Sequence, residues 1–335
     1  MSMLFSPISF SGLTIRNRIV MPPMATVFEG PGGSQKDDGI PGEATIAHYE
    51  KRSKNGVGMI IVEHSYVSKK GKAHLGQLGI DRDEAIPAFK ALAGAIKRGG
   101  AVAALQINHV GAAGNPDVTG YDPLGPSDVS VPNNERKPQP MTKDDIAGTI
   151  EGFALAAKRA REAGFQAVEA HAAHGYLLTQ FLSPVTNRRN DEYGGSLDNR
   201  ARFLLQIIEA VRHQTGRDYP VFVRLGSIDG IEGGIVPEDA AEVAKMLEQA
   251  GVALIDVSGG FMGSRPKNAP PGYFVSAASV IKEQVDIPVL VTGGITDPCL
   301  AETILQEGKA DLIGIGRALL RDAEWVSKAR DAAQR

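Results

Sequence analysis

The chain has 335 residues, 42% of them hydrophobic and 22% charged, which is typical of a soluble globular protein with a large core. Its formal net charge of -3 and dispersed basic residues give no reason to expect nucleic acid or an anionic membrane as a partner. No run of eighteen apolar residues occurs, and the start lacks the charged-then-apolar order of a signal peptide, so we expect a cytoplasmic protein. The one cysteine, Cys299, can form neither an internal disulfide nor an iron–sulfur cluster.

Short apolar runs alternate with helical periods along the whole chain, without a low-complexity linker, and predict one domain over residues 1–335. The predicted strands are Ile19–Met24, Met59–Glu63, Ala101–Gln106, Ala167–His171, Val221–Leu225, Leu254–Ser258, Pro288–Val291 and Leu312–Ile315. The predicted helices are Ile46–Lys54, Ala85–Arg98, Lys143–Ala163, Leu197–Thr215, Pro237–Ala250, Ser276–Gln284, Cys299–Glu307 and Leu319–Ala333. Eight such units with apolar strands predict an α/β fold, a single closed (β/α)8 TIM barrel. No Gly-x-Gly-x-x-Gly follows the first strand, which disfavours a Rossmann domain.

Two segments depart from this alternation. Ser6–Ile15, before the first strand, suits an amino-terminal hairpin that closes the barrel floor. Gly111–Pro140, after strand three, is rich in Gly, Pro, Asp and Asn and predicts a lid over the barrel mouth. A passive surface loop is the alternative for this insertion.

His171, His174 and Tyr176 lie at the end of the fourth predicted strand and in the loop after it, where parallel α/β proteins place ligand chemistry. Neutral imidazole N–H groups can hold a carbonyl or nitro oxygen, and a tyrosine can give a proton to a carbanion-like centre. This spacing alone is weak evidence, since the residues also suit a structural role. A zinc site is a competitor, but no third ligand is visible, so we expect no metal.

Arg224 lies within the apolar run Val221–Leu225, where an unpaired guanidinium would be costly to bury. An anionic group must therefore face it, either a ligand or a barrel carboxylate such as Glu63 or Asp256. Gln106 ends strand three, where its amide can both donate and accept hydrogen bonds.

Gly293 and Gly294 follow strand seven, and Gly316 and Arg317 follow strand eight, where barrels commonly hold phosphate. Glycine backbone N–H groups and one arginine together make an anion site. Both loops indicate a phosphorylated ligand without choosing between FMN and a sugar phosphate.

A longer series of motifs resembles the Old Yellow Enzyme family of FMN-dependent ene-reductases. The histidine–tyrosine cluster is followed by Phe181-Leu-Ser-Pro184, by Asn187-Arg-Arg-Asn-Asp-Glu-Tyr-Gly-Gly-Ser196 and by Asn199-Arg-Ala-Arg-Phe203. Further matches, in family order, are Leu4-Phe-Ser-Pro7, Arg16–Met24, Gly58–Glu63, Leu105–His109, Phe222-Val-Arg224, Val291–Thr296 and Asp311–Leu320. The resemblance covers nearly the whole chain.

The resemblance implies tightly bound, non-covalent FMN, NAD(P)H as hydride donor and an electron-poor alkene, such as an enone or nitroalkene, as substrate. In the family, the matching backbone of Pro22, Pro23, Met24 and Ala25 packs beside the flavin ring, Gln106 meets its pyrimidine edge, and Arg224 lies by N1 and O2. Gly293, Gly294, Gly316 and Arg317 would hold the phosphate. His171 and His174 would then hold the activating oxygen of the alkene, with Tyr176 as proton donor to the α-carbon.

Some features depart from the family pattern. Ala25 stands where yeast-like members have threonine and another subgroup has cysteine, so side-chain tuning of the flavin potential is absent there. The chain ends at Ala-Gln-Arg335 without the terminal arginine finger of the subgroup that shares sites across a dimer, so dimerisation by that route is not expected, and whether the chain forms a homo-oligomer stays open. His64 is an additional imidazole near the barrel mouth. It is either a contact of the lid or a structural residue. A barrel aldolase or isomerase acting on a sugar phosphate, and a non-catalytic flavin-binding protein, are the alternative functions.

Overall fold

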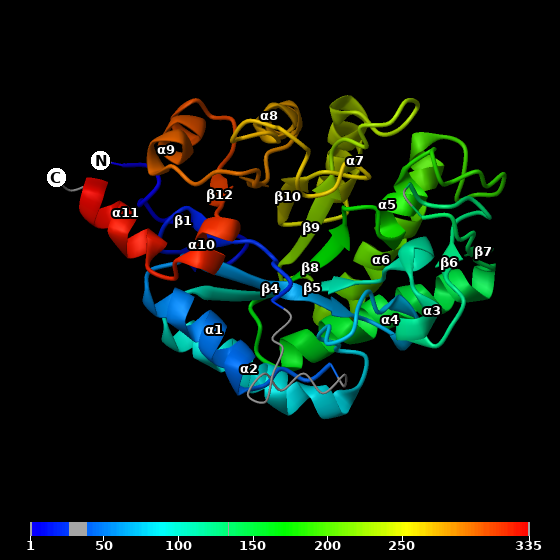
Figure 1. The fold of residues 1–335 in the computed structure, drawn as a ribbon, viewed down its shortest axis with the longest axis horizontal. Helices are drawn as coiled ribbons and strands as arrows, with labels where there is room; N and C mark the ends of the chain where they lie inside the picture. Colours follow the sequence, from blue (N-terminus) through cyan, green and yellow to red (C-terminus); the bar gives the residue numbers. More distant parts are fainter. Residues whose placement is uncertain (1, 27–38, 133, 334–335) are drawn as a thin grey trace.

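The computed structural model describes residues 2–26, 39–132 and 134–333. Eight parallel strands close into a barrel, and helices surround it (Figure 1). In barrel order the strands are β3 (Ile19–Met21), β4 (Met59–Tyr66), β5 (Val102–Asn108), β8 (Ala167–Ala172), β9 (Val221–Gly226), β10 (Leu254–Ser258), β11 (Val289–Val291) and β12 (Leu312–Gly314). The predicted (β/α)8 barrel is confirmed. That residues 1–335 form one domain stays a prediction, because residues 1, 27–38, 133 and 334–335 lie outside the described residues.

The strand bounds differ from the predicted ones at the first strand. The prediction of Ile19–Met24 is three residues too long, because β3 ends at Met21. Pro22 and Pro23 follow at once, and proline has no N–H to give to the strand ladder. The two prolines therefore end the strand, and the chain leaves the sheet at the barrel mouth.

The helices that alternate with the strands agree closely with prediction, except at the carboxyl end. They are α1 (Glu43–Lys54), α2 (Ile86–Arg98), α4 (Lys143–Glu162), α6 (Leu197–Thr215), α7 (Pro237–Gln249), α8 (Val275–Lys282) and α9 (Pro298–Gln306). The single helix predicted at Leu319–Ala333 is wrong, since two helices occupy that region, α10 (Arg317–Arg321) and α11 (Trp325–Ala333). Asp322 between them is extended, and its carboxylate accepts a hydrogen bond from the Glu324 N–H at 2.9 Å. No described helix has the combined length and apolar character that a bilayer crossing requires.

A two-stranded hairpin closes the amino end of the barrel, as predicted. Strands β1 (Ile8–Phe10) and β2 (Leu13–Ile15) pair antiparallel. Leu13 and Ile15 join the buried cluster that fills the barrel interior, and the ring of Phe10 lies 6.1 Å, between centroids, from that of Phe222. The floor of the barrel is therefore apolar.

The insertion after β5, predicted as the lid at Gly111–Pro140, has secondary structure of its own. It contains the short helix α3 (Pro116–Thr119) and the strands β6 (Leu124–Gly125) and β7 (Gln139–Pro140), and it lies beside the barrel near α5 (Leu177–Leu182) in Figure 1. Arg189 holds it in place by donating hydrogen bonds to the carbonyl of Pro126, in its middle, and to that of Met141, just after it, at 3.0 and 2.8 Å. Its function as a lid stays a prediction.

Candidate active site

Polar side chains form one layer inside the barrel, above the apolar floor. Gln106 pairs in register with Glu169 across β5 and β8, His171 pairs with Arg224 across β8 and β9, and Arg224 pairs with Asp256 across β9 and β10. All five residues are buried. Because strand side chains alternate between faces, these residues project from neighbouring strands into the same interior.

Arg224 makes only loose contacts with the protein. Its Nε lies 3.2 Å from Asp256 Oδ2, without the geometry of a hydrogen bond, and its two terminal nitrogens donate to Pro23 O and Thr292 Oγ1, each at 3.4 Å. Of the two carboxylates considered from sequence, Asp256 faces it, whereas Glu63 instead accepts hydrogen bonds from Thr26. A buried guanidinium with such long contacts can still donate to an anionic ligand.

Two buried carboxyl groups differ in charge at this layer. Gln106 Nε2 donates to Glu169 Oε1 at 2.8 Å, and the other oxygen of Glu169 has no hydrogen-bond partner among the described residues. Burial, reinforced by the negative charge of Asp256, raises the pKa of Glu169 well above its usual value. Burial also raises the pKa of Asp256, to about 6, against the opposing effect of Arg224. Of the two carboxyl groups, Glu169 therefore favours the protonated form more strongly, and Asp256 is the counterion of Arg224.

His171 and His174 lie together at the carboxyl end of β8, as predicted. Their ring centroids are 4.9 Å apart. His171 Nδ1 accepts a hydrogen bond from the Ala173 N–H at 3.3 Å, so the neutral ring carries its proton on Nε2. His174 Nε2 lies 2.7 Å from Ser258 Oγ, and donation by that hydroxyl leaves an N–H on Nδ1.

The backbone fixes His174 in an uncommon conformation. Its φ of 57° is in the left-handed region, and its N–H donates to Gly259 O at 2.9 Å. The positive φ of 74° at Gly175 continues the turn. Desolvation lowers the pKa of both His171 and His174 well below the usual value, so both rings are neutral.

Tyr176 completes the predicted cluster. Its ring centroid lies 5.0 Å from that of His171, and the residue precedes α5 as its N-cap. The side chain is only partly buried, and burial raises its pKa above the usual value, so the phenol keeps its proton. The short helix α5 that orients Tyr176 was missing from the sequence prediction.

His64 is a third imidazole in this cluster. Its ring centroid lies 6.2 Å from that of His171 and 5.7 Å from that of Tyr176, and its Nδ1 lies 2.8 Å from Gln77 Nε2. Burial lowers its pKa to about 3. The register between β4 and β5 shifts between Val62 and Ser65, and such a bulge re-aims side chains. Strand periodicity alone could therefore not predict the direction of His64.

Most of the predicted cofactor residues line one cavity of about 130 Å³ next to Arg224. Those that line it are Pro22, Met24, Arg224, Gly293, Gly294, Gly316 and Arg317. The other three do not line it: Pro23 accepts from Arg224, Gln106 donates to Glu169, and Ala25 is exposed. For all ten residues the predicted contact with a cofactor stays a prediction.

The glycines of this cavity are required by its shape. Gly294 has a φ of 72°, and a Cβ there would lie 2.9 Å from the Tyr273 ring. A Cβ at Gly316 would lie 3.0 Å from Met24 Sδ. Glycine thus keeps the backbone open to a ligand at both loops, as an FMN phosphate would need, and the residues present fit that group.

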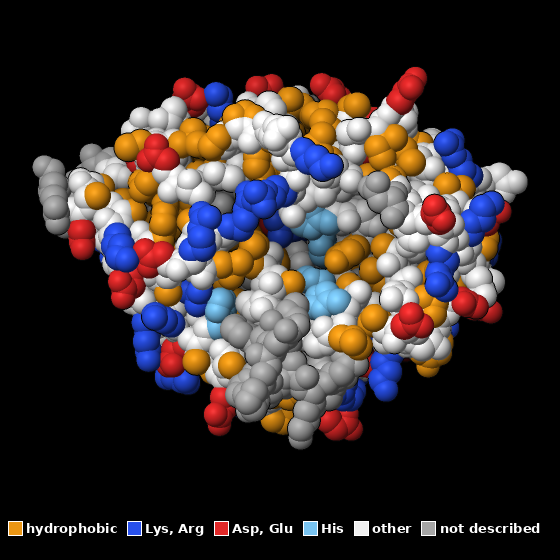
Figure 2. Space-filling view, viewed as in Figure 1, with side chains coloured by type: hydrophobic (Ala, Val, Ile, Leu, Met, Phe, Trp, Pro, Cys, Tyr) orange, Lys and Arg blue, Asp and Glu red, His pale blue; other side chains and the backbone are white. Residues whose placement is uncertain are grey.

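Arg265 is a cavity residue that the sequence interpretation missed. It is exposed and lines the same cavity as Arg317, and Ser264 beside it accepts a hydrogen bond from the Tyr273 hydroxyl at 2.9 Å. That hydroxyl accepts in turn from Arg317 at 3.1 Å. In Figure 2, Lys and Arg side chains gather at the edge of a central hollow in which histidine atoms are visible. A single arginine in a Gly- and Pro-containing loop gave no sequence signal for this position.

Comparisons with known proteins agree with this geometry. The family described as NADH:flavin oxidoreductase / NADH oxidase matches residues 3–335. An NADPH dehydrogenase of Bacillus subtilis (strain 168) is 42% identical over 97% of this chain and 94% of its own length. An NADH oxidase of Thermoanaerobacter brockii is 41% identical over 99% of this chain, but the chain spans only 51% of that relative.

A solved structure extends the likeness to the fold. The Old Yellow Enzyme homologue from Zymomonas mobilis has a TM-score of 0.83 and 28% sequence identity, with 98% of this chain and 93% of that chain covered. Together with the match over residues 3–335, this implies FMN as the cofactor and NAD(P)H as the hydride donor. The chain belongs to the NADH:flavin oxidoreductase, or Old Yellow Enzyme, family, and is an FMN-dependent NAD(P)H oxidoreductase of that type.

Proposed function

We propose that this oxidoreductase reduces the activated C=C bond of enones, nitroalkenes or related electron-poor alkenes. The observation that carries the proposal is the cluster of His171, His174 and Tyr176 at centroid distances of 4.9 and 5.0 Å, with every ring neutral. Two N–H donors and a protonated phenol are the groups that an alkene conjugated to a carbonyl or nitro group requires.

Each residue of the cluster has a separate task in the proposal. His171 Nε2–H and His174 Nδ1–H bind the activating oxygen of the substrate and draw electron density toward it. Tyr176, held at the start of α5, gives its proton to the α-carbon. Bound FMN supplies the hydride that it has taken from NAD(P)H. The separate donor and acid positions let binding and protonation occur on one bound substrate.

The cofactor site divides between a ring end and a phosphate end. We assign Pro22, Pro23, Met24, Ala25, Gln106 and Arg224 to the ring of FMN, on the strength of the family resemblance and the burial of Arg224. Gly293, Gly294, Gly316 and Arg317 are assigned to its phosphate, with Arg265 as an added cation at the same cavity. One FMN-binding domain over residues 1–335 is part of the proposal.

Family membership leaves the sugar-phosphate aldolase or isomerase without support. A flavin-binding protein without turnover is the alternative that experiment must separate. For such a protein, changes to His171, His174 and Tyr176 would not alter the rate of reduction of any alkene.

The deciding experiment is stopped-flow measurement of the two half-reactions for Tyr176→Phe, which keeps the ring and removes the phenol. Alkene reduction of cyclohexenone should slow by about 10²-fold or more, as for loss of a general acid, while flavin reduction by NAD(P)H stays nearly normal. A nitroalkene should be affected less, because its stabilised nitronate can leave before protonation. Tyr219→Phe is the matched control, since that hydroxyl donates to Phe165 O near the opposite end of the barrel. Equal slowing of both half-reactions, or of neither, would contradict the role of Tyr176.

A further inference from the structure

His64 is a buried side chain at the histidine–tyrosine cluster that the proposed function does not use. It lies in the irregular part of β4 and is only 9% exposed. Its ring centroid lies 6.2 Å from that of His171 and 5.7 Å from that of Tyr176, and those two centroids are 5.0 Å apart. The three rings are therefore mutual neighbours, with His64 at one corner of a triangle.

His174 lies outside this triangle. Its ring centroid is 4.9 Å from that of His171, and among the described residues no ring contact joins His174 to His64 or Tyr176. His171 and His174 thus form one edge of the cluster, where the proposed function places the activating oxygen of the alkene. His64 lies beyond that edge, next to the ring of Tyr176.

The amide of Gln77 determines which nitrogen of His64 carries the proton. Gln77 is fully buried, and its Oε1 accepts a hydrogen bond from the Ala73 N–H at 2.6 Å, so the other end of the amide is the donor. Its Nε2 lies 2.8 Å from His64 Nδ1 and donates to Asn108 Oδ1 at 2.9 Å. His64 Nδ1 must therefore accept, and the proton of the neutral ring is on Nε2.

The Nε2–H of His64 can donate to a bound molecule. This nitrogen forms no hydrogen bond of normal geometry with a described residue, and it is not one of the fully enclosed polar atoms. The activating oxygen of the substrate does not need this donor, because a carbonyl oxygen has two lone pairs and the proposed function gives one each to His171 and His174. A third N–H donor at the cluster therefore fits a second acceptor.

We propose that His64 is a specificity-determining residue that binds a second oxygen of the substrate, so that the site prefers alkenes with a carbonyl group on each alkene carbon. The inference rests on the proposed function. His171 and His174 hold the first carbonyl oxygen, and Tyr176 still protonates the carbon next to that carbonyl. The second carbonyl, on the carbon that receives the hydride, accepts from His64 Nε2–H. The extra hydrogen bond orients the alkene and leaves the reaction itself unchanged.

Two substrates that differ only in the second carbonyl test this role: 2-cyclohexene-1,4-dione and 2-cyclohexenone. His64→Phe keeps a planar ring and removes the donor, and Gln77 Nε2 keeps its hydrogen bonds to the carbonyl of residue 64 and to Asn108. Stopped-flow oxidation of the reduced, FMN-loaded enzyme by the dione should slow at least ~10-fold, or ~1.4 kcal/mol. Oxidation by cyclohexenone should change less than about threefold.

Two further variants at position 64 separate the donor from the shape of the ring. His64→Gln places an amide N–H at a similar reach and should restore most of the rate with the dione. His64→Ala repeats the loss of the donor without the bulk of a phenyl ring. A glutamine variant no faster than His64→Phe would show that ring shape, not hydrogen bonding, matters, and would overturn the proposal.

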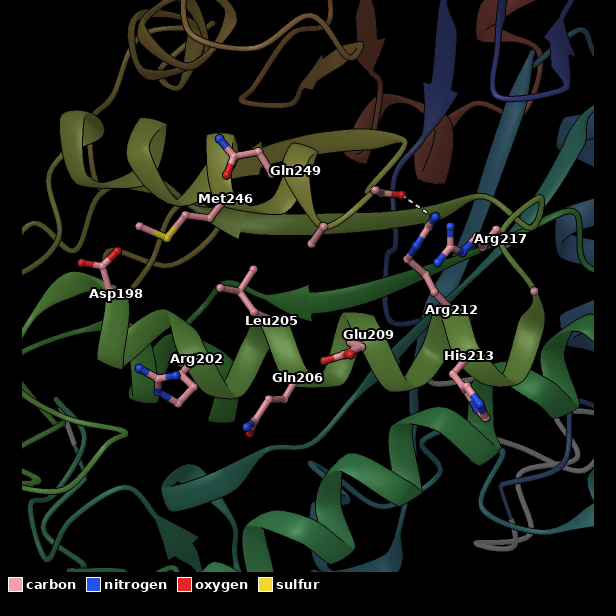
Figure 3. A pocket seen from close by; sticks show the side chains of 13 residues that line it. Asp198, Arg202, Leu205, Gln206, Glu209, Arg212, His213, Arg217, Met246 and Gln249 are labelled. Atoms are coloured by element: carbon pink, nitrogen blue, oxygen red, sulfur yellow. Dashed lines mark hydrogen bonds between the residues drawn. The ribbon is translucent and has the colours of Figure 1, made fainter.

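Controls at two other histidines complete the experiment. His174→Ala should slow both substrates, because that ring serves the first oxygen. His213→Phe makes the same exchange at the outer groove between α6 and α7 (Figure 3) and should leave both rates unchanged.

The outcomes distinguish this inference from the proposed function. A wild-type enzyme that reduces neither substrate would contradict the proposed function itself. If both substrates are reduced, equal slowing of the two in His64→Phe, no slowing of either, or slowing of flavin reduction by NAD(P)H in place of dione reduction would overturn the role of His64 alone.

Discussion

The two ends of the barrel interior are built from the same strands, but one end is apolar and the other is polar. On β9 Phe222 lies in the apolar floor and Arg224, two residues on, lies in the polar layer; on β10 Leu254 and Asp256 repeat the pattern. Strand geometry is the same at both levels, because alternate side chains point inward throughout. A change of residue type over two positions therefore separates the apolar part of the interior from the polar part, which we propose binds ligand.

The polar layer also holds several unpartnered polar atoms. Arg224 Nε, one oxygen of Glu169 and both oxygens of Asp256 are buried there without a hydrogen-bond partner among the described residues, as are Asn108 Nδ2 and Thr179 Oγ1 outside the layer. Such groups are costly in a folded protein and need an explanation. A ligand that accepts a hydrogen bond from Arg224 Nε and donates to these carboxyl oxygens would supply one.

The largest expected effect of breaking the polar end comes from replacing His171 and His174 together with alanine. Each preorganised donor contributes about 2.7 kcal/mol or more, so reduction of cyclohexenone should slow by at least ~10³-fold. The unfolding free energy should change far less than the rate, because the two rings face the cavity. Stopped-flow rates and urea unfolding of the same preparations measure both. Full activity in the double variant would remove these residues from substrate binding.

The reciprocal change at the floor is Phe222→Ala. This fully buried ring fills the interior beside the hairpin, so its loss should destabilise the protein by about 3–5 kcal/mol. The folded fraction should retain its rate and its FMN affinity within about twofold, since Phe222 does not line the cofactor cavity. Denaturant unfolding and turnover per bound flavin decide the point. A rate loss comparable to that of the double histidine variant would show that the two ends are not separable.

Much of this division could be predicted from sequence. The eight apolar runs predicted the barrel, and the position of His171 at a strand end predicted its meeting with His174 and Tyr176. Both predictions depend on apolar runs of strand length, which are a local property of the sequence. The expectation that Arg224 faces an anionic group followed from its place within the apolar run Val221–Leu225.

What could not be predicted depends on contacts between distant segments. The bulge that directs His64 is a mismatch between two strands, and Arg265 reaches the cavity through a loop whose path no periodicity specifies. From the sequence, either Glu63 or Asp256 could pair with Arg224. The register between β9 and β10, which places Asp256 beside Arg224, decides between them. The break between α10 and α11 depends on one side chain, Asp322, satisfying a backbone N–H.

A smaller effect within the polar layer should come from Asp256→Asn, which keeps the shape and removes one negative charge beside Arg224. The midpoint potential of bound FMN should rise by tens of millivolts, about 30 mV for each 1.4 kcal/mol. The reason is that the positive charge of Arg224, no longer neutralised by Asp256, stabilises the anionic reduced flavin more strongly. Dye-equilibration potentiometry measures it. Glu169→Gln is the matched control, since burial raises the pKa of that carboxyl and favours its neutral form, so its replacement should change the potential less. Equal shifts in both variants would show that both carboxyl groups carry charge.

The smallest expected effect is that of pH on the polar layer. Burial lowers the pKa of His171 and His174 well below 6.5, and that of His64 to about 3, so none of the three gains a proton as pH falls from 8 toward 5.5. The pKa of Tyr176 is raised, so its phenol stays protonated over the same range. The stopped-flow rate of cyclohexenone reduction should therefore be flat between about pH 5.5 and 8.

The stability of the protein should depend on pH, unlike the rate. Below about pH 6.5 the histidines of the unfolded chain bind protons, whereas the buried histidines of the folded chain do not. The free energy of unfolding should therefore fall as the pH drops through 6.5. A rate inflection near pH 6.5 that disappears in His171→Ala or His174→Ala would show that an imidazolium, not a neutral ring, holds the substrate oxygen.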